Sequence, residues 1–188
     1  IRINEALHHK NIGKIADQIT ANENIKLVTI AGPSSSGKTT FSKRLYLHLR
    51  ANEITPIVIS LDDYYIGRKN VPLDEDGNKD YETIDALDLK LLNENLRDLI
   101  AGKEVEIPEY NFISGEREKV GKMMKVPEHG LIIIEGIHGL NEKLTAAIPK
   151  KNKFKIYVSC LTQLNIDRHN RIATSDVREI RRLVRDSL

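Results

Sequence analysis

One stretch of the chain combines glycine, serine, lysine and threonine at a spacing suited to binding phosphate. It reads Gly32-Pro33-Ser34-Ser35-Ser36-Gly37-Lys38-Thr39, which fits the pattern G-x-x-x-x-G-K-[ST] without a gap. The glycines allow the backbone to curl so that successive N–H groups face phosphate oxygens. Lys38 would bridge the β- and γ-phosphates of a nucleotide, and the Thr39 hydroxyl would bind magnesium. We predict a loop that binds ATP and Mg²⁺ through Gly32, Ser34, Ser35, Ser36, Gly37, Lys38, Thr39 and Thr40.

Acidic residues follow two apolar runs further along the chain. Asp62 comes soon after Ile57-Val58-Ile59-Ser60, and Glu135 ends Leu131-Ile132-Ile133-Ile134. Such carboxylates lie at the carboxyl end of parallel strands, where ligands bind. Asp62 could orient a hydroxyl for attack on the γ-phosphate and accept its proton, whereas Glu135 would lie beside Thr39 and bind magnesium. The pattern favours a kinase.

The elements that must position these residues alternate between strands and helices. Runs rich in β-branched residues predict strands at 25–31, 57–60, 131–135 and 154–159. Apolar residues at helical spacing predict helices at 5–21, 38–50, 89–100 and 140–148. Residues 104–107 and 123–126 resemble a short hairpin around a loop. We predict an α/β fold of the three-layer P-loop NTPase type, with a central parallel sheet, helices on both faces and a small β-hairpin excursion.

Composition and charge exclude several classes of protein. The 188 residues are 40% apolar and 30% charged, which suits a folded domain and not a membrane or disordered chain. The single Cys160 excludes a disulfide framework and fits a reducing cytoplasm. A formal charge of +2 argues against nucleic acid as the main partner and leaves homo-oligomerisation open. Half of the arginines lie in the last 21 residues, so the positive charge is locally concentrated.

Several motifs in a fixed order resemble the uridine kinase/phosphoribulokinase family. They are the segments 32–40, 60–65, 108–112, 133–137 and 176–186. The resemblance implies ATP- and Mg²⁺-dependent phosphorylation of the 5′-hydroxyl of a ribonucleoside, which would be a small-molecule partner beside ATP. It extends over nearly the whole chain from residue 26 onward.

The resemblance also implies roles for residues of the acceptor site. Asp62 would be the catalytic base, and Tyr65 would belong to the acceptor pocket. Glu82 stands where uridine kinases have an aspartate that holds the ribose hydroxyls. Tyr110 and Phe112 match the aromatic pair that packs around the nucleobase.

The arginine-rich end of the chain resembles the lid of these kinases. Arg178 and Arg181 match lid arginines that contact the phosphates of the substrate and of ATP, so with Asp62 and Lys38 they complete the predicted catalytic set. Arginine forks suit phosphate oxygens. We expect residues 1–24 to form an N-terminal helix and linker, and residues 25–188 a P-loop kinase domain with a truncated lid, cut from a longer chain.

One departure from the family pattern concerns the acceptor. Uridine kinases place a base-reading histidine three residues after the pocket phenylalanine, where this chain has Gly115. A kinase of another sugar or of a pantothenate-like alcohol is therefore an alternative. A second alternative is a non-catalytic ATP-binding regulatory module of a larger protein.

Overall fold

A parallel sheet forms the centre of the protein. The structure is a computed structural model that describes residues 2–160, 167–170 and 172–187. Within them the sheet has the strand order β2 (Thr55–Ser60), β7 (Gly130–Glu135), β1 (Leu27–Ala31) and β8 (Lys153–Tyr157). All three pairings are parallel, and Glu135 lies opposite both Ile30 and Ser60. The carboxyl ends of three strands therefore meet at one edge.

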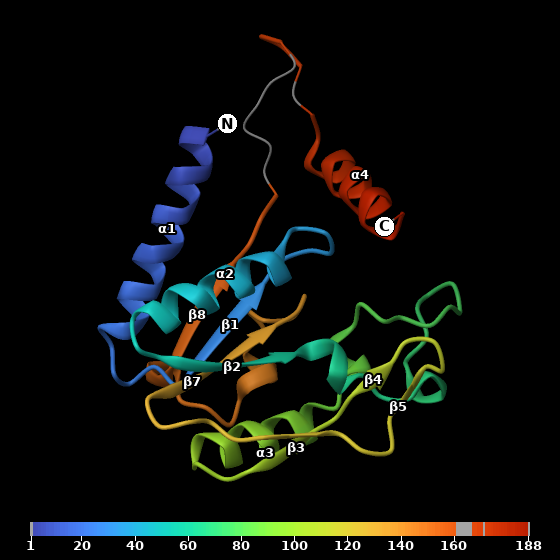
Figure 1. The fold of residues 1–188 in the computed structure, drawn as a ribbon. Helices are drawn as coiled ribbons and strands as arrows, with labels where there is room; N and C mark the ends of the chain where they lie inside the picture. The colour runs from blue at the N-terminus through green and yellow to red at the C-terminus, as the bar shows by residue number, and fades with distance from the viewer. Residues whose placement is uncertain (1, 161–166, 171, 188) are drawn as a thin grey trace.

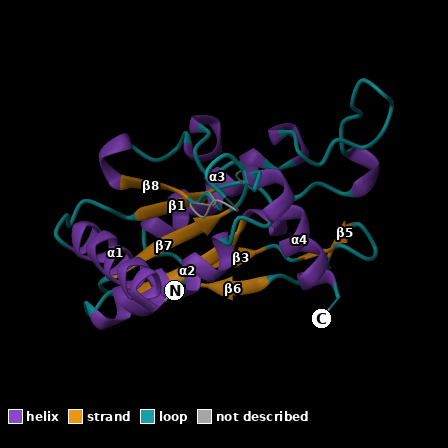
Figure 2. Ribbon diagram, turned by 90° about the horizontal axis from the view of Figure 1, so that it is seen from above, coloured by secondary structure: helices purple, strands orange, loops and turns teal. Residues whose placement is uncertain are grey.

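Helices cover both faces of this sheet, as predicted. Helices α1 (Arg2–Thr20) and α2 (Lys38–Ala51) lie together on one face, and α3 (Leu89–Ile100) lies on the other (Figures 1 and 2). Strand β7 shows why both faces need cover: Ile132 and Ile134 pack with α3, whereas Leu131 and Ile133 pack with α1 and α2. Because successive side chains point to opposite faces, a strand buried on both sides is apolar throughout.

The excursion between α3 and β7 contains two small hairpins. Strands β3 (Val105–Ile107) and β6 (Lys122–Met124) form the predicted one. Inside it, β4 (Tyr110–Asn111) pairs with β5 (Glu116–Arg117), and this second hairpin was not predicted. The carboxylate of Asp88 caps α3 by accepting a hydrogen bond from the Leu91 amide at 3.0 Å. Short 3-10 helices are found at Leu61–Tyr64, Arg68–Asn70, Ile84–Ala86, Glu142–Thr145 and Lys150–Asn152.

The helix predicted at residues 140–148 is wrong in type and length, because that segment holds only the 3-10 turn Glu142–Thr145. Helix α4 (Thr174–Asp186) lies on the side toward which the arrows of β1 and β7 point (Figures 1 and 2). Part of the connection that precedes it, at residues 161–166 and 171, lies outside the described residues. No helix in the described ranges is long and apolar enough to cross a membrane.

The first residue of the phosphate loop must be glycine, because another segment of backbone approaches it closely. A Cβ on Gly32 would lie 2.2 Å from the carbonyl oxygen of Val158. We expect Gly32→Ala to lower the free energy of unfolding by about 1–3 kcal/mol, because backbone and not a flexible side chain must move. Gly13 is the matched control: it lies inside α1, where a Cβ meets only ordinary contacts at 3.6 Å from His48.

Gly13→Ala should stabilise the protein by about 0.5–1 kcal/mol, since alanine loses less backbone entropy in a helix. Urea titration followed by circular dichroism measures both changes. Equal stability of wild type and Gly32→Ala would contradict the steric account.

Candidate active site

The phosphate loop curls between β1 and α2 in the way the sequence predicts. Ser35 has φ 60° and Gly37 has φ 100°, and left-handed residues of this kind let successive amides form an anion-binding concavity. No side chain caps the first turn of α2, so its amides remain available for a phosphate. The buried hydroxyls of Ser35 and Ser36 have no hydrogen-bond partner among the described residues. The loop thus offers polar groups and a helix N-terminus to an anion.

Thr39 and Glu135 come together although they are far apart in sequence. The Thr39 hydroxyl donates a hydrogen bond of 2.8 Å to the Glu135 Oε1. This contact exists because α2 starts at the same sheet edge where β7 ends. One hydroxyl and one carboxylate fit Mg²⁺, which prefers oxygen ligands and takes the remainder from phosphates and water. No cluster of three or more His, Cys, Asp or Glu side chains in the described part of the chain forms a metal site by itself.

Asp62 lies in the 3-10 turn that directly follows β2. The turn is held by Ser60, whose hydroxyl accepts a hydrogen bond from the Asp62 amide at 3.2 Å. Asp62 is exposed and lines the pocket, and the protein around its carboxylate removes part of its hydration. Desolvation therefore raises the pKa of Asp62 above its usual range, and the nearby Lys38 partly opposes this. A carboxylate with a raised pKa is a stronger base.

Lys38 interacts electrostatically with both acidic side chains, Glu135 and Asp62. Its Nζ donates to the Pro33 carbonyl oxygen at 3.2 Å. Burial lowers the pKa of Lys38, while Glu135 and Asp62 raise it and Arg178 lowers it further. A partly desolvated ammonium gains most from an added negative charge. The site is therefore electrostatically prepared for phosphate.

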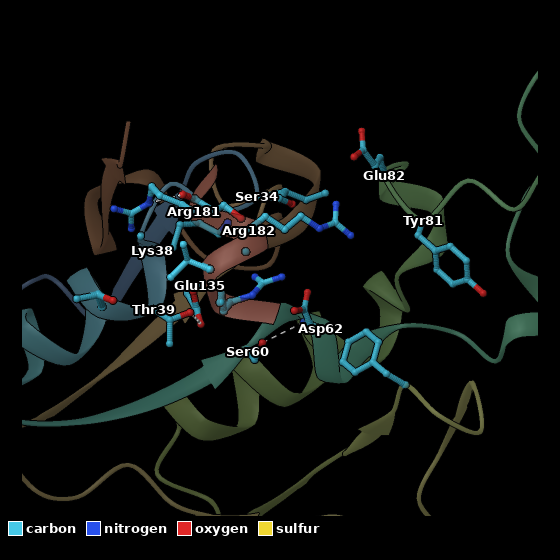
Figure 3. A pocket seen from close by; sticks show the side chains of 18 of the residues that line it. Ser34, Lys38, Thr39, Ser60, Asp62, Tyr81, Glu82, Glu135, Arg181 and Arg182 are labelled. Carbon is cyan, nitrogen blue, oxygen red and sulfur yellow. Dashed lines mark hydrogen bonds between the residues drawn. The ribbon is translucent and has the colours of Figure 1, made fainter. Parts of the chain in front are cut away.

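These residues line one pocket of about 880 Å³. Figure 3 shows Asp62 between the residues of the phosphate loop and the segment that carries Tyr81 and Glu82. Of the predicted site residues, the pocket is lined by Ser34, Ser35, Gly37, Lys38, Thr39, Thr40, Asp62, Tyr65, Glu82, Phe112, Glu135 and Arg181. Gly32 and Ser36 belong to the loop but are buried.

Aromatic side chains form the wall farthest from the phosphate loop. Tyr65, Tyr81 and Phe112 line the pocket, and the Tyr65 hydroxyl donates to the Tyr81 carbonyl oxygen at 2.9 Å. Tyr110 is buried behind them, with its ring centroid 5.6 Å from that of Tyr65 and 5.1 Å from that of Phe112. The predicted pair is thus divided: Phe112 faces the pocket and Tyr110 supports it. Tyr81 was not predicted from the sequence.

Helix α4 lies across the phosphate loop. The Nε of Arg178 donates to the Ser34 carbonyl oxygen at 2.9 Å, and the Nε of Arg181 donates to that of Ser35 at 3.0 Å. The pocket is also lined by Arg182 and Arg185, which the sequence analysis did not single out. Positions 178, 181, 182 and 185 follow helical spacing, so the pattern i, i+3, i+4, i+7 could have identified one cationic face.

Arg117 is a further residue that the sequence analysis missed. From β5 its guanidinium donates to the carbonyl oxygens of Tyr64 and Tyr65, both at 3.0 Å, and to the Asp88 carboxylate at 3.2 Å. It therefore ties the inner hairpin to the segment that carries Asp62 and to the cap of α3. Sequence spacing contains no signal for this, because the partners are 29 to 53 positions away.

We expect Arg117→Met to lower the free energy of unfolding by about 1.5–3 kcal/mol, the range for hydrogen bonds to a charged group. The variant removes the arginine donor from the Tyr65 carbonyl oxygen and leaves the Tyr64 carbonyl oxygen with only the Asp88 amide, and it loosens the wall that carries Phe112. Arg117→Lys is the control, because it keeps the charge but cannot reach all three partners. In thermal unfolding, stability should decrease in the order wild type, Arg117→Lys, Arg117→Met. An Arg117→Met variant as stable as the wild type would contradict the structural role of Arg117.

Comparison with known proteins relates this geometry to a family. The model of the "Phosphoribulokinase / Uridine kinase family" matches residues 27–187. "Uridine kinase" of Staphylococcus aureus (strain JH9) is 33% identical over 161 residues, which cover 86% of this chain and 68% of the relative. "Inorganic pyrophosphatase TTM2" of Arabidopsis thaliana is 41% identical over 124 residues, covering 65% of this chain. The match spans only 17% of that plant protein's length.

Solved structures show the same fold. A structure described as a possible uridine kinase from Bacillus stearothermophilus has a TM-score of 0.63 at 23% identity, with 81% of each chain covered. D-glycerate 3-kinase from Cryptococcus neoformans has a TM-score of 0.53 at 19% identity, covering 70% of this chain and 52% of that one. At these identities the likeness concerns the arrangement of the sheet and its helices.

Proposed function

Because the chain belongs to the phosphoribulokinase/uridine kinase family of ATP-binding P-loop kinases, we propose that it phosphorylates the 5′-hydroxyl of a ribonucleoside. Uridine or cytidine is the simplest acceptor. The observation that carries this proposal is that one pocket holds Asp62 with the phosphate loop on one side and aromatic rings on the other. The relative named uridine kinase, at 33% identity, supports the same assignment.

The reaction would proceed by in-line transfer. The acceptor oxygen forms a bond to the γ-phosphorus, the bond to the β–γ bridging oxygen breaks, and ADP leaves with that electron pair. Asp62 takes the proton of the attacking hydroxyl. Lys38 and the loop amides hold the phosphates, and Arg181 supplies positive charge from α4. Thr39 and Glu135 would hold Mg²⁺, which neutralises phosphate charge when bound.

The other wall of the pocket would bind the nucleoside. Phe112, Tyr65 and Tyr81 offer faces and edges for a flat base, and Glu82 offers a carboxylate to the sugar hydroxyls. Closure of α4 over the pocket would exclude water and so limit ATP hydrolysis.

One observation favours a second candidate, a kinase of another small alcohol. Gly115 carries no side chain that could read a pyrimidine, and a Cβ there would meet the Arg68 side chain at 2.5 Å. A carboxylate-bearing acceptor such as pantothenate would suit that cationic neighbour.

An acceptor panel tests the proposal. The full-length protein with ATP and Mg²⁺ is assayed for ADP release with uridine, cytidine, pantothenate and ribulose 5-phosphate, and a no-acceptor reaction measures ATP hydrolysis. We expect acceptor-dependent turnover with a pyrimidine nucleoside. ATP binding without turnover of any acceptor would favour a regulatory module, and hydrolysis of added pyrophosphate would point to the activity named for the plant relative.

A further inference from the structure

The space beside Gly115 is filled by a side chain from a different segment. A Cβ at this position would lie 2.5 Å from the Nε, 2.8 Å from the Cζ and 3.0 Å from the Nη2 of Arg68. Gly115 also has φ +73°, a backbone conformation that side-chain-bearing residues rarely adopt. The fold therefore places a guanidinium where a residue at position 115 would project its own side chain.

Two hydrogen bonds hold Arg68 against the inner hairpin. Its backbone amide donates to the Gly115 carbonyl oxygen at 2.8 Å, and its Nη2 donates to the Phe112 carbonyl oxygen at 3.2 Å. The guanidinium thus lies next to Phe112, whose ring lines the acceptor pocket, although Arg68 itself is not one of the residues that line this pocket. It is also close enough to the Tyr110 hydroxyl to counteract part of the rise in the pKa of Tyr110 that burial causes.

Arg68 keeps most of its donors for a ligand. A guanidinium has five N–H groups in a planar fork and no acceptor, and only one of them is used by Phe112. Arg68 is exposed, and no carboxylate in the described ranges lies within ion-pair distance of it. A planar fork of donors matches a ligand group with two adjacent acceptor atoms.

We propose that Arg68, and not the residue at position 115, recognises the edge of the acceptor that extends past Phe112. It selects an acceptor that presents two adjacent hydrogen-bond acceptor atoms on that edge. This inference rests on the proposed function, because it assumes that an alcohol is phosphorylated in the pocket beside Asp62.

The arrangement of hydrogen-bonding groups distinguishes phosphoryl acceptors that are otherwise similar. Cytosine presents O2 and N3 as neighbouring acceptors, which one guanidinium can bind together. Uracil presents the N3–H donor between its two carbonyl oxygens, and this donor would face the donors of Arg68. A carboxylate also has two adjacent acceptors, so cytidine and a carboxylate-bearing alcohol share the required feature and uridine does not.

The test compares kcat and KM of the full-length protein for cytidine, uridine and pantothenate at saturating ATP. We expect the wild type to prefer cytidine or pantothenate over uridine by about tenfold or more in kcat/KM, within the range of a bidentate arginine contact. Arg68→Met should remove this preference, mainly by raising KM for the preferred acceptor. Arg68→Lys keeps the charge but not the fork and should lose most of the preference as well.

Two further variants make the result specific. Lys69→Met removes the neighbouring exposed cation and should leave the preference unchanged. Gly115→Ala retains Arg68 but displaces its guanidinium, so it should reproduce the loss of preference. Whichever of cytidine and pantothenate depends on Arg68 identifies the source of the paired acceptors.

Different results would contradict the role of Arg68 and the proposed kinase activity. Nucleoside turnover with the same acceptor preference in wild type and Arg68→Met would overturn the role of Arg68 and leave the kinase intact. A wild type that binds ATP but phosphorylates none of the acceptors would overturn the proposed function and the inference together.

Discussion

Replacing Asp62 by asparagine is expected to lower kcat for phosphoryl transfer by about 10²- to 10⁴-fold, the usual contribution of a general base. Asparagine has nearly the same shape, but its amide cannot accept the proton of the attacking hydroxyl. ATP binding should be nearly unchanged, because the loop amides and Lys38 that would hold the phosphates remain. Steady-state kinetics and calorimetric titration with a non-hydrolysable ATP analogue measure the two quantities separately.

Asp63 is the matched control for this variant. Its carboxylate accepts a weak hydrogen bond from the Tyr110 amide at 3.4 Å, and it does not line the pocket. Asp63→Asn keeps a carbonyl acceptor for that amide, so most of the activity should remain. Equal kcat values for wild type and Asp62→Asn would show that Asp62 is not the general base.

The pH profile provides a second readout of the same carboxylate. Burial raises the pKa of Asp62, and the base must be ionised to accept a proton. Activity should therefore be lost as the pH falls through that raised pKa, above the usual range near 4 for an aspartate. The acid limb of kcat/KM should disappear in Asp62→Asn, and a limb that persists unchanged would assign it to another group.

Replacing Lys38 by methionine is expected to lower kcat/KM for ATP by about 10²- to 10³-fold, the effect of removing one preorganised donor from a developing charge. Methionine fills a similar volume without the ammonium. The loss leaves Asp62 and Glu135 without their shared cation, so the pKa of Asp62, which Lys38 lowers, should rise further. The acid limb of the pH profile should then move to higher pH.

Lys43 serves as the control because it is an exposed lysine on the same helix and is absent from the pocket that holds Lys38. Lys43→Met should retain wild-type kinetics. If Lys38→Met and Lys43→Met behaved alike, the phosphate loop would not carry the catalytic charge.

The phosphate loop could be predicted because its chemistry is local. Eight consecutive residues between a strand and a helix contain the glycines, the lysine and the threonine, and their spacing requires no distant partner. The same holds for the cap of α3, where Asp88 precedes the helix directly. The short helix expected at 140–148 failed because apolar spacing over so few residues does not distinguish an α-helix from a 3-10 turn.

Contacts between segments that are distant in the sequence could not be predicted from the spacing of residue types. Nothing in the sequence indicates that Arg117 binds the backbone of Tyr64 and Tyr65, or that Tyr110 lies behind Phe112. Both follow from the inner hairpin, whose two-residue strands are too short to show an alternation of polar and apolar residues. Such strands are defined by tertiary packing.

Residue types and their spacing predict the kind of chemistry: a phosphate loop, a carboxylate after one strand and a second carboxylate after another. The arrangement of these parts follows from tertiary packing. Parallel pairing in register places Glu135 beside Ser60 and Ile30 at one sheet edge, and the approach of two loops places Arg68 over Gly115. Residue types are sufficient to predict a phosphate-binding site, because backbone amides and one lysine can bind any phosphate. The choice of acceptor depends on which side chain occupies a given volume, and only packing between distant segments determines that.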